Sequence, residues 1–203
     1  MLDGAARRLI GPGLDRMGGA LAGRGVSADA VTIAGFGIGL LAAVAIVAEV
    51  YALGLALIAA SRLCDGLDGA VARHRGKTDF GGYLDIVLDF GFYGAIPLAF
   101  VLARPEANAV AGAVLIASFY LNGASFLAYA ALAARRGLST EARGEKSLYF
   151  TTGLAEATET IAVFCLMCVF PGAFAWIAYG FAALCFVTAG ARVRLAMRVF
   201  GRA

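Results

Sequence analysis

Long apolar stretches dominate this chain, and short polar segments separate them. From Val31 to Cys64 the sequence is apolar almost without a break, which is too long for one membrane span of about 20 residues and fits two. Glu49 and Tyr51 mark the turn between these two spans. The pattern predicts an all-α, polytopic membrane protein. Its six spans are expected near residues 31–48, 51–72, 81–103, 108–134, 148–170 and 173–195.

The N-terminal segment has a different pattern. Leu9, Leu14 and Met17 recur near helical spacing, and arginines and aspartates lie between them. This arrangement is typical of an amphipathic helix that lies in the headgroup plane. Pro12 and several glycines are also compatible with a disordered basic tail whose charges only follow the positive-inside rule. We expect an interfacial helix over residues 1–24.

Composition supports the membrane assignment. Of the 203 residues, 61% are hydrophobic and only 15% are charged, which excludes a soluble domain with a large core. No internal repeat and no linker divides the sequence, so residues 1–203 are expected to form a single domain.

The positive charges lie on one side of the predicted membrane. All but Arg62 and Arg104 of the 17 lysines and arginines fall in the two terminal segments and in the loops after the second and fourth spans. The positive-inside rule then places both termini on the cytoplasmic face of a bacterial inner membrane. This distribution also argues against nucleic acid as a partner.

Four aspartates lie close together between two apolar stretches. Asp65 and Asp68 share one helical face, and so do Asp85 and Asp89, because their spacings are three and four residues. Two helices joined by a short basic loop would bring the pairs together. Carboxylates in apolar surroundings need a counter-charge, and ligand sets made only of oxygen favour Mg, Mn or Ca over Zn.

The same segment contains a motif of eight fixed positions, D-x2-D-G-x2-A-R-x7-G-x3-D-x3-D. These positions are Asp65, Asp68, Gly69, Ala72, Arg73, Gly81, Asp85 and Asp89. In this motif, and in its length and hydropathy, the chain resembles the CDP-alcohol phosphotransferases.

The resemblance implies a reaction and a metal centre. Asp65, Asp68 and Asp85 would be metal ligands, and Asp89 would join the metal site and act as general base on an acceptor hydroxyl. Two Mg²⁺ or Mn²⁺ ions would bridge the diphosphate of a CDP-linked alcohol. Attack by the acceptor on the β-phosphorus would release CMP.

Nucleotide binding is expected to involve six residues. They are Thr32, Asp68, Gly69, Ala72, Arg73 and Gly81. Glycine at 69 suits close approach of the nucleotide, although a packing glycine in a membrane helix is the alternative. Arg73 would hold a phosphate or contact the cytidine, or it is an ordinary flanking arginine.

Thr32 belongs to a second, weaker match. Residues 28–32 resemble the P-N-x-x-T segment of the family, with Ala28 in place of proline and Asp29 in place of asparagine. Thr32 is expected to touch the nucleotide. Asp29 would repel a phosphate, so we expect it to cap the first spanning helix.

Several polar residues outside the motif are candidates for acceptor binding. Arg143, Lys146 and Tyr149 lie where an acceptor phosphate would dock, but positive-inside charge explains the two cations equally well. Glu156 and Glu159 would line an acceptor pocket or bond to Arg62, and the sequence leaves both interpretations open. Asn122 is expected to form an interhelical hydrogen bond rather than to bind a ligand.

Together, the sequence pattern and the resemblance predict a homodimeric membrane enzyme of phospholipid synthesis. The expected donor is CDP-diacylglycerol, and glycerol 3-phosphate is preferred over inositol phosphate and serine as the small acceptor. Three alternatives are an intramembrane prenyltransferase, a cation-coupled transporter and an inactive scaffold. Prenyltransferase motifs lie far apart in sequence, transporter sites lie near the midplane, and a scaffold would not need an intact motif.

Overall fold

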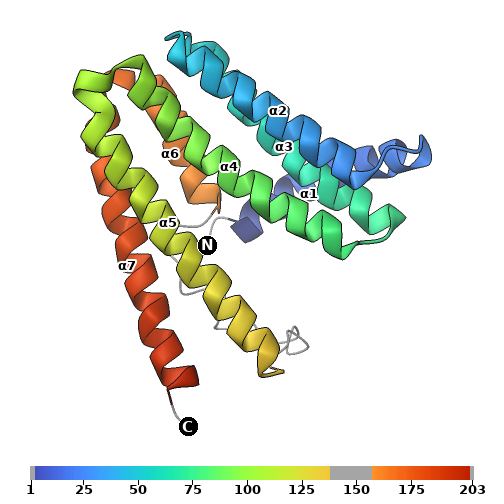
Figure 1. The fold of residues 1–203 in the computed structure, drawn as a ribbon. Coiled ribbons are helices and arrows are strands. Elements are labelled where there is room, and N and C mark those ends of the chain that lie inside the picture. The colour runs from blue at the N-terminus through green and yellow to red at the C-terminus, as the bar shows by residue number, and fades with distance from the viewer. Residues whose placement is uncertain (1–2, 138–156, 202–203) are drawn as a thin grey trace.

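The computed structural model describes residues 3–137 and 157–201, and their regular structure is entirely helical (Figure 1). In chain order the helices are α1 (Asp3–Gly23), α2 (Ala28–Val47), α3 (Tyr51–Arg75), α4 (Asp79–Ala103), α5 (Pro105–Arg135), α6 (Ala157–Val169), the 3-10 turn η2 (Pro171–Ala173) and α7 (Phe174–Phe200). The predicted all-α class is confirmed for this part of the chain.

The helices form two packed groups. Helix α2 packs on α3 and α4, and α1 packs on α3, whereas α5 packs along α7. Contacts between α4 and α5 and between α3 and α6 join the groups. Stacked and edge-on aromatic rings fill the junction: Phe92 and Phe164 have centroids 6.0 Å apart, and Phe100 and Phe174 have centroids 4.9 Å apart.

Four described helical segments are long and apolar enough to cross a membrane: α2, α4, α5 and Pro171–Phe200, which contains α7. Helix α3 is long, but Arg62 and two motif aspartates interrupt its apolar sequence, and the described part of α6 has only 13 residues. The spans near 51–72 and 148–170, and hence the count of six, stay predictions.

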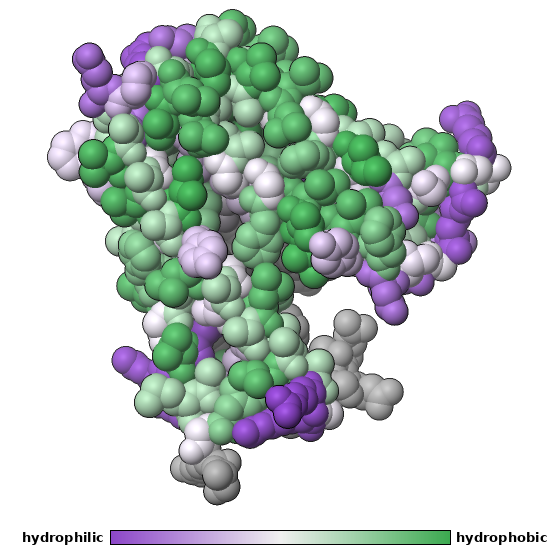
Figure 2. Space-filling model, viewed as in Figure 1, coloured by the Kyte–Doolittle hydropathy of each residue, from purple (hydrophilic) through white to green (hydrophobic). Residues whose placement is uncertain are grey.

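The outer surface fits a lipid environment. Figure 2 shows apolar residues over most of the visible face, with hydrophilic residues gathered at its extremities. Large apolar side chains remain exposed on the spanning helices, including Val44 at 63% and Val110 at 69%. A soluble protein rarely leaves so much contiguous apolar surface in water, whereas hydrocarbon chains solvate it.

Helix α1 confirms a helix at the N-terminus, and it lies against α3. A Cβ on Gly18 would sit 2.5 Å from the Ala70 Cβ, so glycine permits this close approach. Arg73 Nη2 donates to Asp15 Oδ1 at 3.2 Å and ties the two helices together. The position of α1 in the headgroup plane stays a prediction.

Local capping explains where α2 and α4 begin. The Ser27 side chain accepts a hydrogen bond from Ala30 N, so Ser27 is the N-cap of α2. The expectation that Asp29 caps this helix is therefore wrong. Asp29 lies in the first turn, where its negative charge interacts favourably with the positive end of the helix dipole. Thr78 caps α4 in the same way by accepting from Gly81 N at 3.0 Å.

The opposite ends of these helices are linked by an ion pair. Glu49 has a φ of 59° in the turn before α3, and its carboxylate accepts from Arg104 Nε at 3.1 Å in the turn between α4 and α5. This hydrogen bond lowers the pKa of Glu49 from its ordinary value. The predicted turn at Glu49 is confirmed, and so is the predicted break between the spans near 81–103 and 108–134, where Arg104 lies.

Candidate metal and nucleotide site

The motif folds as two antiparallel helix segments. Asp65 and Asp68 lie in the second half of α3, and Asp85 and Asp89 lie in the first half of α4. The loop that joins them is short: α3 ends at Arg75, and α4 begins four residues later with Thr78 as its cap. The chain reverses direction at Gly76, whose φ of 100° is a conformation that residues with a side chain rarely adopt. The two pairs of aspartates thus face each other.

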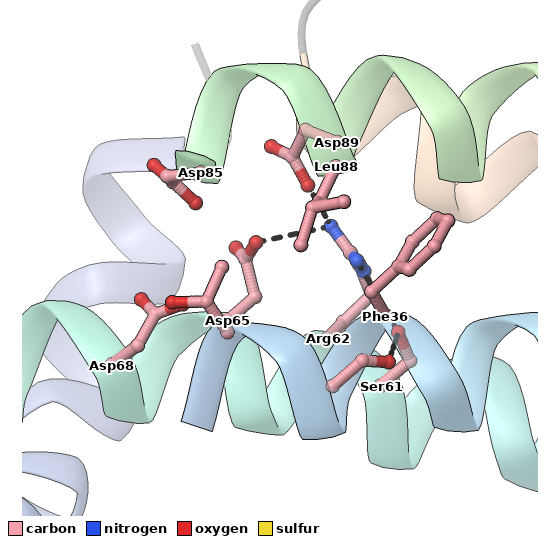
Figure 3. A pocket seen from close by; sticks show the side chains of 10 residues that line it. Phe36, Ser61, Arg62, Asp65, Asp68, Asp85, Leu88 and Asp89 are labelled. Carbon is pink, nitrogen blue, oxygen red and sulfur yellow. Dashed lines mark hydrogen bonds and ion pairs between the residues drawn. The ribbon is translucent and has the colours of Figure 1, made fainter. Parts of the chain in front are cut away.

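Three carboxylates converge in one pocket. Oxygens of Asp65, Asp85 and Asp89 all lie within 4.8 Å of one another, and each residue is half-buried. Figure 3 shows these side chains pointing toward the space between α3 and α4. The predicted pairing of the two halves of the motif is confirmed by this geometry.

Asp68 lies at the edge of the same pocket and is the most buried of the four. Its exposed fraction is 7%, and among the described residues its Oδ2 atom has no hydrogen-bond partner. A buried carboxylate oxygen without a donor carries a large desolvation cost. A divalent cation that accepts oxygen ligands would remove that cost.

The donor set suits a hard divalent metal. Four carboxylates face a single guanidinium in this pocket, so negative charge remains in excess. Carboxylate oxygens are the ligands that Mg²⁺ and Mn²⁺ prefer. The residues present therefore fit the metal centre that the motif predicts, with Asp65, Asp85 and Asp89 clustered and Asp68 adjacent.

The guanidinium belongs to Arg62, one turn before Asp65. Arg62 Nη1 lies 3.2 Å from Asp65 Oδ1 and 2.7 Å from Asp89 Oδ1. The sequence leaves Glu156 and Glu159 open as partners of Arg62. Glu156 lies outside the described residues, and within them Arg62 pairs with two motif aspartates. The i, i+3 spacing of Arg62 and Asp65 on one helix was the signal that could have shown this.

Helix α2 supplies the wall behind the aspartates. Ser61 Oγ donates to the Gly35 carbonyl at 2.8 Å, and a Cβ on Gly35 would lie only 2.8 Å from the Cys64 Cβ. Thr32 lines the same pocket as Asp68, and its hydroxyl donates to the Ala28 carbonyl at 3.0 Å. The structure thus brings Thr32 to the motif across a gap of more than thirty residues in sequence.

Gly69 faces open space rather than a packed helix. A Cβ there would meet no described atom closer than Arg73 Nη1, at 3.9 Å. Helix packing within the described residues therefore does not require glycine at this position, which favours the interpretation that a ligand approaches it. By contrast, a Cβ on Gly81 would lie 2.9 Å from Thr78 Oγ1 and 3.0 Å from Asp29 Oδ1.

The remaining predicted residues lie outside the pocket lining or outside the described chain. Ala72 is half-buried and Arg73 is exposed near the end of α3, where Arg73 bonds to Asp15. Arg143, Lys146, Tyr149 and Glu156 lie outside the described residues, and Glu159 lies in the first turn of α6. Asn122 in α5 accepts from Arg192 Nη1 of α7 at 2.7 Å, which confirms the expected interhelical hydrogen bond.

One known protein resembles this chain over nearly all of its length, and another resembles part of it. It is 47% identical over 193 residues to inner membrane protein YnjF of Escherichia coli (strain K12), a match that covers 95% of this chain and 94% of that protein. An archaetidylinositol phosphate synthase of Methanothermobacter thermautotrophicus is 42% identical over 84 residues, which cover 41% of this chain and 40% of that enzyme.

A solved structure has the same fold. The phosphatidylinositol phosphate synthase of Mycobacterium tuberculosis with bound CDP-DAG superposes with a TM-score of 0.71 at 21% identity, covering 91% of this chain and 93% of that one. Residues 26–190 match the CDP-alcohol phosphatidyltransferase family, and this range includes the whole carboxylate pocket. The chain is an integral membrane protein, and it belongs to the CDP-alcohol phosphatidyltransferase family.

Proposed function

We propose that this protein transfers a phosphatidyl group from CDP-diacylglycerol to the hydroxyl of a small acceptor and releases CMP, with Mg²⁺ or Mn²⁺ as cofactor. The observation that carries the proposal is the clustering of Asp65, Asp85 and Asp89 beside Asp68 in one pocket. Membership of the family supports the reaction class.

Each motif aspartate has a role in this proposal. Asp65, Asp68 and Asp85 hold the two divalent ions, which would neutralise charge on the diphosphate when bound. Asp89 contributes to the same site and accepts the proton of the acceptor hydroxyl. The acceptor oxygen then bonds to the β-phosphorus, the bond from that phosphorus to the bridging oxygen breaks, and CMP leaves.

The nucleotide is placed beside the start of α2 and the end of α3. Thr32 and Asp68 line the pocket, and Gly69 leaves room next to Asp68. Ala72 and Gly81 complete the proposed set of nucleotide-binding residues. Arg73 uses Nε and Nη2 on Asp15, so its Nη1 group remains as a donor toward a phosphate.

The acceptor is a small molecule that carries a hydroxyl and, in our proposal, a phosphate. Arg143 and Lys146 are the residues proposed to bind that phosphate, which supports glycerol 3-phosphate. Two similar proteins named archaetidylinositol phosphate synthases give inositol phosphate as the second candidate. Both acceptors are anionic polyols, and the same cationic side chains would serve either one.

The orientation and the assembly are also proposals. The distribution of lysine and arginine supports a site and two termini on the cytoplasmic side of a bacterial inner membrane. A soluble acceptor would reach the pocket from there, and the lipid donor would enter from the bilayer. Family resemblance supports a homodimer.

The test is CMP release by purified protein supplied with CDP-diacylglycerol and Mn²⁺, with glycerol 3-phosphate, inositol phosphate or serine added in turn. We expect CMP with one phosphorylated acceptor and none after chelation of the metal. CMP formation that is unaffected by EDTA would contradict the metal role, and release with serine alone would contradict the acceptor assignment.

A further inference from the structure

Arg62 is a cation built into the carboxylate pocket. Its side chain is only 11% exposed, and its Nη1 atom contacts Asp89 Oδ1 at 2.7 Å and Asp65 Oδ1 at 3.2 Å. Figure 3 shows the guanidinium reaching from α3 toward α4, with both contacts made by the same nitrogen. One atom outside the eight-position motif therefore bridges the two halves of that motif.

The guanidinium is held in this position by its surroundings. Its Nη2 atom donates to Ser61 Oγ at 3.2 Å, and Ser61 in turn donates to the backbone of α2. The Arg62 Cζ atom lies 4.1 Å from the centroid of the fully buried Phe92 ring. A cation–π contact away from water and a fixed hydrogen bond both favour one conformation of the side chain.

We propose that Arg62 is the resident counter-cation of the metal site and competes with divalent ions for Asp65 and Asp89. This inference rests on the metal site of the proposed function and assigns to that site a residue that lowers its affinity for metal. The Asp89 Oδ1 atom shares its negative charge with Arg62 and therefore binds a metal ion less strongly. The guanidinium also repels a doubly charged ion held by the same carboxylates. Arg62 thus keeps the affinity for free metal low.

The competition also couples metal to nucleotide. The diphosphate of the donor brings negative charge that offsets Arg62, so the pocket binds a divalent ion more tightly once the nucleotide is present. Metal and nucleotide therefore reinforce each other's binding by reciprocal linkage. Removal of the positive charge at position 62 should weaken that coupling.

If Arg62 only oriented the metal ligands, its removal would change the metal affinity in the opposite direction. Loss of a side chain that only orients metal ligands lowers metal affinity by about 10–100-fold. Loss of a competing cation raises it, and we expect a rise of about tenfold, equivalent to about 1.4 kcal/mol. The sign of the change therefore separates the two roles.

The experiment uses the full chain in detergent and Mn²⁺ alone as the probe. Wild type, Arg62→Met, Arg62→Lys and the control Arg75→Met are titrated with Mn²⁺, and free Mn²⁺ is followed by electron paramagnetic resonance. Arg75→Met is a matched control because it makes the same substitution at the exposed end of the same helix. The titrations are repeated with CMP, and thermal unfolding is recorded in EDTA and in Mn²⁺.

We expect Arg62→Met to bind Mn²⁺ about tenfold more tightly than wild type, to gain less affinity from CMP, and to unfold at a lower temperature in EDTA. Arg62→Lys keeps the charge and should lie between wild type and Arg62→Met. Arg75→Met should match wild type in every measurement. Unchanged or weaker Mn²⁺ binding by Arg62→Met overturns the inference.

Three further outcomes are decisive. If Arg62→Met is unfolded in EDTA, recovery of the folded protein by Mn²⁺ supports the inference, and failure of both Mn²⁺ and the added substitution Asp89→Asn to recover it overturns the inference. If neither wild type nor Arg62→Met binds Mn²⁺, the metal assignment under the proposed function fails as well. If wild type binds Mn²⁺ and Arg62→Met binds it no better, only the role of Arg62 is rejected.

Discussion

Asp89 differs from the other motif aspartates in its contacts. It forms the shorter of the two Arg62 ion pairs, at 2.7 Å, while one of its oxygens lies within 4.8 Å of an oxygen of Asp65 and of Asp85. The residue is half-buried and lines the pocket. These contacts fit a carboxylate that shapes the metal site, and the proposed function adds the role of proton acceptor.

We expect Asp89→Asn to lower turnover by at least about 100-fold, because a carboxamide cannot accept the proton of the acceptor hydroxyl. Nucleotide and Mn²⁺ binding should remain measurable, since Asp65, Asp68 and Asp85 are retained. The control is Asp79→Asn, the same change at an exposed position on the same helix. Near-normal CMP release by Asp89→Asn would exclude Asp89 as the base.

A substitution at Gly69 shows whether a ligand occupies the open space beside this residue. Gly69→Ala should leave the free energy of unfolding unchanged or raise it by about 0.5–1 kcal/mol, because alanine is the better helix former. Binding of CMP should nevertheless weaken. Gly82→Ala, which also adds a Cβ in open space, is the control for CMP binding and thermal unfolding. Equal CMP affinities in the two variants would contradict the assignment of Gly69.

The contact between α2 and α3 sets the shape of the pocket at the level of elements. Gly35 lets the two helices approach, and Ser61 fixes them by a buried hydrogen bond to the Gly35 carbonyl. This contact places Thr32 on the aspartate side of α2 and positions the Ser61 hydroxyl for Arg62. The pocket therefore depends on a helix that contributes none of the four aspartates.

Gly35→Ala should destabilise the protein by about 1–3 kcal/mol, because the new Cβ would force apart two closely packed backbones. Gly37→Ala is the matched control on the same helix, since a Cβ there meets no described atom within 4 Å. Thermal unfolding in detergent compares the two variants. A melting temperature for Gly35→Ala that equals that of Gly37→Ala would show that α2 and α3 separate without cost.

At the scale of the whole molecule, the described ion pairs of helices α1 to α4 gather at two ends of those helices. The carboxylate pocket and the Asp15–Arg73 pair lie where α3 and α4 meet, whereas Glu49 and Arg104 join the far ends of the same bundle of helices. The second link connects two turns that are distant in sequence. It limits how far α2 and α3 can move relative to α4.

The Glu49 link should make stability depend on pH. Its folded-state pKa is lowered by the hydrogen bond from Arg104, so its contribution is fully present above the ordinary pKa of glutamate and is lost as pH falls through the lowered value. Thermal unfolding should show wild type more stable than Glu49→Gln at pH 7, with the difference disappearing at strongly acidic pH. Because the pair is exposed, high salt should also reduce the difference.

The double variant Glu49→Gln, Arg104→Met completes the test. It should be no less stable at pH 7 than either single variant, because the two changes remove the same interaction. A stability difference between wild type and Glu49→Gln that persists unchanged at pH 3 would contradict the role of the pair.

The sequence by itself determined the helical class, the turns at Glu49 and Arg104 and the grouping of four aspartates, because apolar runs, turn residues and i, i+3 or i+4 spacing are local properties of the chain. Tertiary structure alone decided which polar atoms satisfy one another. Arg62 of α3 bonds to Asp89 of α4, and Ser61 of α3 bonds to the Gly35 carbonyl of α2. Such choices follow from how α2, α3 and α4 pack, and packing joins residues that no local pattern relates.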